Sequence, residues 1–118
     1  MARFLLASDD AWTRIGVARA LERAGHTADH VTHLKLASEE ADLYGVGAVL
    51  VALQQPEHRD LFVAGLRKRD PEIPVVVLLD AWSPWREPLG EAAVSVVLRQ
   101  PVEVRQVVDQ LEDLAGVS

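Results

Sequence analysis

Apolar and polar residues follow two patterns along this chain of 118 residues: short continuous apolar runs, and longer stretches with helical spacing. The clearest apolar runs are 3–7, 47–53, 74–79 and 94–98, and a weaker, more polar run covers 26–31. The last three of the clear runs are rich in β-branched residues and apolar on both faces, which is typical of buried parallel strands. The polar run 26–31 predicts an edge strand.

The stretches between the runs predict helices. Residues 103–115 give the clearest one, with an apolar face made of Val104, Val107, Val108, Leu111 and Leu114. Residues 11–24 carry a second stripe that ends at Gly25, where the missing side chain favours a helix stop. Residues 60–69 carry a third stripe, expected to face inward through Leu61, Phe62, Gly65 and Leu66. Residues 34–44 predict a weaker helix whose inward positions are Leu36, Ala37, Ala41 and Tyr44.

The alternation of strands and helices predicts an α/β fold with a doubly wound, five-stranded parallel sheet and helices on both faces, as in flavodoxin. The whole chain, 1–118, is expected to be one domain. One stretch departs from the pattern. Residues 80–93 stand where a fourth helix belongs, but Pro84 and Pro88 each remove a backbone donor. We therefore expect that helix to be short or distorted.

Composition narrows the classes of partner. The net charge of −6 argues against direct nucleic-acid binding, which needs clustered Lys and Arg. The absence of cysteine excludes disulfides and thiolate metal sites. No apolar stretch reaches the ~18 residues of a membrane span, and the first residues lack a secretory pattern. We expect a cytoplasmic domain without membrane contact.

Five segments carry a family resemblance: RFLLASDD, ALERAGH, VLVALQQP, LRKRDPEIPVVVLL and VVLRQPV. Together they resemble the receiver domain of bacterial two-component response regulators over nearly the whole chain. In that family a histidine kinase phosphorylates an aspartate at the end of the third strand. An acidic pair holds Mg²⁺, a Thr or Ser on the fourth strand contacts the phosphoryl group, and a Lys after the fifth strand neutralises it.

The residues at these positions do not match that chemistry. They are Ala52 for the phosphoacceptor, Ser8 and Asp9 for the acidic pair with Asp10 just beyond, Leu79 for the hydroxyl, Gln100 for the lysine, and Val97 for the aromatic switch position on the fifth strand. The resemblance therefore implies a degenerate receiver, or pseudo-receiver, that is not phosphorylated. We expect no enzymatic activity, no cofactor and no bound metal.

The substitutions are mutually consistent in physical terms. A lysine beside Ala52 would be a poorly compensated cation at a partly buried site, and the neutral Gln100 avoids that cost. Asp9 remains the one clear metal ligand, and a single carboxylate is a poor magnesium site. Two alternatives stay open. Asp10 or Asp80 could serve as a substitute phosphoacceptor, and the empty site could hold a small ligand.

The histidines at 26, 30 and 33 suggest metal spacing, although exposed histidines on an edge strand are the favoured interpretation.

Trp82 and Trp85 both lie in the proline-interrupted segment, and tryptophan is enriched at binding hot spots. The alternative is that one or both fold inward to cap the core.

The predicted function is phosphorylation-independent protein–protein interaction in bacterial two-component or phosphorelay signalling, through a protein partner or by self-association as a dimer. The alternative is a ligand-gated regulatory domain of a transcriptional regulator.

Overall fold

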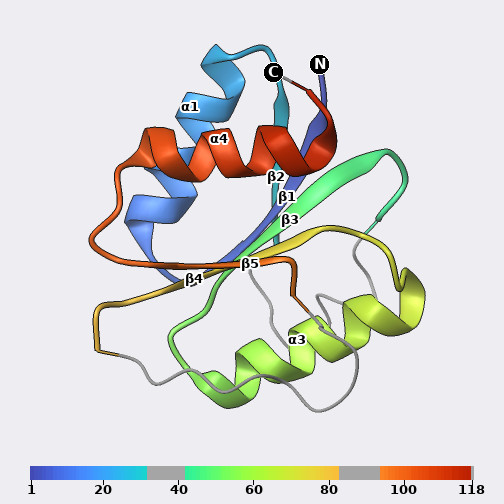
Figure 1. Cartoon of the computed structure of the whole chain (residues 1–118), viewed down its shortest axis with the longest axis vertical. Coiled ribbons are helices and arrows are strands. Elements are labelled where there is room, and N and C mark those ends of the chain that lie inside the picture. The colour runs from blue at the N-terminus through green and yellow to red at the C-terminus, as the bar shows by residue number, and fades with distance from the viewer. Residues whose placement is uncertain (32–41, 83–93, 118) are drawn as a thin grey trace.

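Five parallel strands form a single sheet in the order β2-β1-β3-β4-β5 in the computed structural model, which describes residues 1–31, 42–82 and 94–117 (Figure 1). The strands are β1 (Arg3–Ser8), β2 (Thr27–Val31), β3 (Val46–Ala52), β4 (Val75–Leu79) and β5 (Val96–Arg99). This arrangement confirms the predicted five-stranded parallel sheet. The edge position of β2 is confirmed as well.

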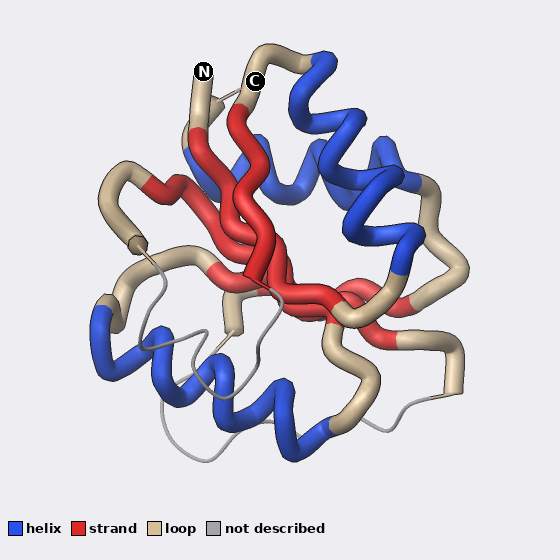
Figure 2. The backbone as a smooth tube through the Cα atoms, turned by 180° about the vertical axis from the view of Figure 1, so that it is seen from behind, coloured by secondary structure: helices blue, strands red, loops and turns tan. Residues whose placement is uncertain are grey.

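Helices cover both faces of the sheet (Figures 1 and 2). The π-helix η1 (Trp12–Val17), α1 (Ala18–Arg23) and α4 (Val104–Ala115) lie on one face, and α3 (Pro56–Arg69) lies on the other. The predicted helix over 11–24 is therefore present, but its first half has π geometry. It ends as expected, since Gly25 adopts a φ of 90°, which favours glycine.

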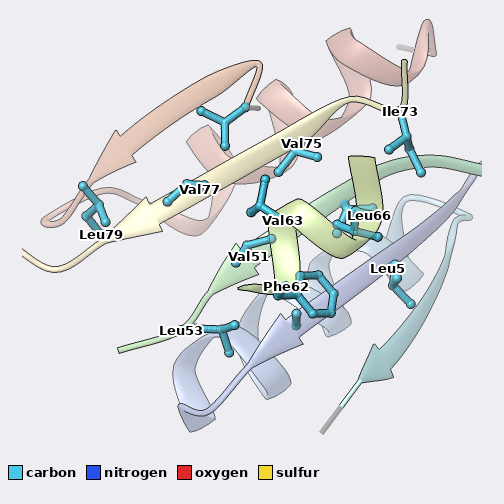
Figure 3. Packing of buried hydrophobic residues seen from close by; sticks show 13 residues of the cluster. Leu5, Val51, Leu53, Phe62, Val63, Leu66, Ile73, Val75, Val77 and Leu79 are labelled. Carbon is cyan, nitrogen blue, oxygen red and sulfur yellow. The ribbon is translucent and has the colours of Figure 1, made fainter. Parts of the chain in front are cut away.

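The core has two layers, one on each side of the sheet. Side chains alternate along β1, so that Phe4 and Leu6 pack toward α1 and α4, while Leu5 and Ala7 pack toward α3. Figure 3 shows the second layer, in which Phe62 and its neighbours on α3 pack against β3 and β4. Because β1, β3 and β4 are buried on both faces, their carboxyl ends are held in fixed positions.

The expected burial of α3 was wrong in one respect. Leu61 is 71% exposed, and the buried residues are Arg59, Phe62, Val63 and Leu66. Because Arg59 and Val63 extend the buried face to one side of Phe62, Leu61 is left on the other, outward side. The helix also begins at Pro56 rather than at residue 60, with proline in the first turn where its missing N–H costs nothing.

Two other expectations were wrong. Tyr44 is 89% exposed in the turn before β3, so the helix predicted over 34–44 does not extend to it. The strand β5 is only partly buried, because it lies at the edge of the sheet and pairs with β4 alone among the described strands. The rest of the helix predicted over 34–44, and the helix predicted to be distorted after residue 82, fall mainly on 32–41 and 83–93, outside the described residues.

His26 corrects the expectation of exposed histidines. Its ring is buried, and its Nε2 lies 2.8 Å from the carboxylate Oε2 of Glu112 on α4. The backbone N–H of Ala2 donates to the ring Nδ1 at 3.0 Å, so Nε2 carries the proton that Glu112 accepts. His30 is exposed, as expected, and residue 33 lies outside the described part of the chain.

None of the helices in the described ranges has the length and hydropathy needed to cross a bilayer.

Candidate functional site

The carboxyl ends of β3 and β4 open into a small hollow of about 250 Å³, a volume that includes its mouth. It is lined by Asp10, Ala52, Leu53, Gln54, Arg59, Leu78, Leu79, Asp80 and Gln100. The structure thus brings together five of the residues selected from the sequence, which are Asp10, Ala52, Leu79, Asp80 and Gln100. Ser8 and Asp9 lie at the neighbouring end of β1.

The floor of this hollow is hydrocarbon. Ala52 is 4% exposed and Leu79 is 1% exposed, at the last positions of β3 and β4. Gln100 is held above them by its backbone N–H, which donates to the carbonyl of Leu79 at 2.8 Å. At these three positions the structure offers a methyl, an isobutyl and a neutral amide, none of which is an acid, a base or a nucleophile at neutral pH.

Ser8 is buried, and its hydroxyl is used by the backbone of the loop that follows β1. The Oγ donates to the carbonyl of Asp10 at 3.0 Å and accepts the N–H of Asp10 at 3.1 Å. Both contacts fix the turn that leads into η1. The hydroxyl is therefore a local turn-forming group rather than a free ligand.

Asp10 caps the helical stretch that follows. Its Oδ1 accepts the backbone N–H of Thr13 at 2.7 Å, and its Oδ2 accepts the Thr13 hydroxyl at 3.2 Å. A carboxylate in this position satisfies a donor that the first helical turn leaves without an intrahelical partner. Both oxygens of Asp10 are thus engaged by Thr13, whose side chain is buried.

Asp9 is exposed and bridges two loops. Its Oδ2 accepts the backbone N–H of Gln54, two residues beyond Ala52, at 3.1 Å. Asp80 shapes a third loop in a similar way. Its Oδ1 accepts the N–H of Trp82 at 3.0 Å, and its carbonyl accepts a hydrogen bond from Arg99 at 3.2 Å.

Within the described ranges, no group of three or more His, Asp or Glu side chains is arranged to hold a metal ion. Each of Asp9, Asp10 and Asp80 also accepts at least one hydrogen bond from the protein.

Arg59 was missed in the sequence. It is 4% exposed and lines the hollow from the first turns of α3. The signal that would have found it is helical phase, because residue 59 precedes Phe62, Val63 and Leu66 by three, four and seven positions. Arg59 stands among charged residues and a histidine in the sequence EHRD at 57–60, so nothing else in the sequence indicates that it is buried.

Two further predicted positions have clear environments. Val97 is half-buried on β5 and packs against the core layer on the α3 side. Trp82 is 90% exposed immediately after the turn formed by Asp80. Trp85 lies outside the described residues, so the structure does not place it.

Comparisons with known proteins give similarity at the level of structure. No family model matches the chain, and no curated protein matches it in sequence. A CheY-like response regulator receiver domain protein from Methanospirillum hungatei JF-1 superimposes with a TM-score of 0.80 at 18% identity, covering 98% of this chain and 94% of that one. A sensor protein from Polaromonas sp. JS666 gives 0.77 at 23% identity, covering 98% and 96%.

A third similar structure is the receiver domain of the sensor histidine kinase PA1611 from Pseudomonas aeruginosa PAO1, which holds a magnesium ion in its active-site cleft. It superimposes with a TM-score of 0.80 at 18% identity, and 98% of each chain is covered. These similarities establish that the chain has the flavodoxin-like fold of response-regulator receiver domains.

Proposed function

We propose that this chain is a receiver-fold signalling domain of the pseudo-receiver type, which acts by binding other proteins without being phosphorylated. The observation that carries the proposal is Ala52. This residue occupies the end of β3, where the resemblance places the phosphoacceptor, and its buried methyl group cannot form an acyl phosphate.

The neighbouring positions support the same conclusion. Leu79 brings hydrocarbon to the position of the hydroxyl, and Gln100 brings a neutral amide to the position of the lysine. The hydroxyl and the lysine of the family would both contact a phosphoryl group, and Ala52 cannot carry one. A buried lysine without a phosphoryl group or carboxylate beside it would be costly, and Gln100 avoids that cost.

A substitute phosphoacceptor is poorly supported. Asp10 uses both carboxylate oxygens to bind Thr13, and Asp80 uses one to form the turn before Trp82. Phosphorylation of Asp10 would replace a helix cap with a bulky dianion. Because the methyl group of Ala52 stands at the position of the phosphoacceptor, we infer that the domain does not take part in phosphoryl transfer and is not an enzyme.

Ligand gating, as in a regulatory domain of a transcriptional regulator, has less support than protein binding. The 250 Å³ of the hollow includes open solvent, and its cavity volume is only about 10 Å³, far below the ~300–1,000 Å³ that is typical of small-molecule sites. The exposed Trp82 instead offers a large apolar surface to a protein partner. We place this activity in bacterial two-component or phosphorelay signalling in the cytoplasm, with a protein partner or a second copy of the chain and without direct nucleic-acid binding.

The test is a pair of amide NMR spectra, recorded before and after addition of Mg²⁺ and beryllofluoride, which mimics a phosphoryl group on aspartate. The proposal predicts unchanged resonances in the loops after β1, β3 and β4, because the acceptor carboxylate is absent. Saturable shifts at residues 9, 10, 54 or 80 would show that the cleft still responds to a phosphoryl group. Mg²⁺ alone and fluoride alone are the controls.

A further inference from the structure

The outward face of α3 carries a row of four exposed residues at helical spacing. They lie opposite the buried Phe62, Val63 and Leu66, which point at the sheet in Figure 3. The row reads Glu57, Leu61, Ala64 and Lys68, at intervals of four, three and four residues. Such intervals place all four side chains on one line along the helix.

This row is symmetric about its own midpoint. An acidic residue stands at the amino end, a basic residue at the carboxyl end, and a large and a small apolar residue lie between them. Because the intervals are the same in both directions, a second α3 laid antiparallel on the first brings Glu57 opposite the partner's Lys68. The same antiparallel placement brings Leu61 opposite the partner's Ala64.

We propose that this face of α3 is a self-complementary surface, and that it binds a second copy of this chain antiparallel about a twofold axis midway between Leu61 and Ala64. An isologous interface requires that every contact be repeated by symmetry, and the row meets that requirement. The exposed methyl of Ala64 leaves room for the 71% exposed Leu61 of the other copy. The two ion pairs fix orientation and register.

The size of this surface sets the strength of the association. One helix from each copy buries less than the ~1,200 Å² that marks the lower end of stable interfaces. The dimer is therefore weak and reversible, and it forms at high local concentration. The inference goes beyond the proposed function and does not depend on the phosphorylation state of the cleft.

The test is sedimentation equilibrium of the whole chain from about 10 µM to about 1 mM, on the wild type and on charge-reversal variants. In the dimer, E57K places two lysines opposite each other at both symmetric contacts, and K68E places two glutamates there. Each variant should therefore weaken self-association by at least about fivefold. The double variant E57K/K68E restores both pairs and should regain wild-type association. An equimolar mixture of the two single variants should associate more strongly than either variant alone.

Three controls separate pairing from folding. The double variant places unfavourable charges at both ends of α3 and should lose stability while it regains association, so the two readouts move in opposite directions. E22K makes the same charge change on α1, away from the row, and should leave association unchanged. Should a charge reversal unfold the chain, L61Q keeps both charges and should still weaken association.

A monomeric wild type over the whole range would overturn the pairing, and so would association that ignores these substitutions. Either result leaves the proposed function standing. Conversely, a phosphorylated wild type would refute the proposed function and leave this pairing intact.

Discussion

Asp9 and Gln54 are joined across the edge of the cleft, where the carboxylate Oδ2 of Asp9 accepts the backbone N–H of Gln54 at 3.1 Å. This bond ties the loop after β1 to the loop after β3, on either side of the position of Ala52. It uses an oxygen that the resemblance would assign to a metal ion. The hydrogen bond therefore links the two loops directly, through groups of the protein.

Magnesium binding should accordingly be weak. Asp9 and Asp10 already accept protein hydrogen bonds, and the side chain of Ala52 has no oxygen, so we expect a Kd in the millimolar range or weaker. Isothermal titration calorimetry checks this, with A52D as the comparison, since that substitution returns a carboxylate to the cleft and should tighten binding. Micromolar affinity in the wild type would mean that Asp80 or Asp10 completes a site.

Trp82→Ala should leave the free energy of unfolding within about 0.5 kcal/mol of the wild type, because the side chain is 90% exposed. Trp12→Ala is the matched control. Trp12 is partly buried against the core layer on the α1 side, so its loss should cost at least ~2 kcal/mol. Urea denaturation measures both. A large loss for Trp82→Ala would place that residue in the core and move the partner surface elsewhere.

The buried pair of His26 and Glu112 should stabilise the end of α4 against the amino-terminal strand. Glu112→Ala leaves the Nε2–H of His26 buried without its acceptor, at a cost of about 1–3 kcal/mol. Asp109→Ala on the same helix removes only an exposed pair with Arg105 and should cost no more than ~0.5 kcal/mol. Equal losses in urea denaturation would contradict a special role for the buried pair.

Gly47 on β3 lies close against Ala115 at the end of α4. A Cβ at this position would lie 2.8 Å from the Cβ of Ala115, so Gly47→Ala should destabilise the fold by about 1–3 kcal/mol. Adding Ala115→Gly removes the clashing methyl, and the double variant should recover part of the loss. If thermal or urea denaturation finds Gly47→Ala neutral, the packing of α4 on β3 is looser than the structure indicates.

The strands and the last helix were predictable because their signals are long and regular. The buried strands read as continuous apolar runs, and α4 shows one clean apolar face from Val104 to Leu114. The burial of Leu61 was predicted wrongly because Phe62 has an apolar neighbour on each side, Leu61 and Val63. In the folded protein Val63 is buried and Leu61 is exposed, and the local sequence does not distinguish the two. The pairing of His26 with Glu112 spans 86 residues, a separation at which no local pattern carries information.

The candidate site was predictable in part. Strand order alone brings Ala52, Leu79 and Gln100 to one edge, so the sequence located the hollow. The roles of the carboxylates were not readable, because they depend on loop geometry. The carboxylate of Asp10 accepts the backbone N–H of Thr13, and that of Asp9 accepts the backbone N–H of Gln54. The sequence does not show where these backbone donors lie.

The central claim is that the cleft does not accept a phosphoryl group. Intact-protein mass spectrometry after incubation with acetyl phosphate and Mg²⁺ tests it most directly, with an ordinary receiver domain labelled in parallel as the positive control. The account predicts an unmodified mass for this chain under conditions that label the control. A base-labile, hydroxylamine-sensitive phosphoryl adduct that maps to Asp9, Asp10 or Asp80 would contradict it.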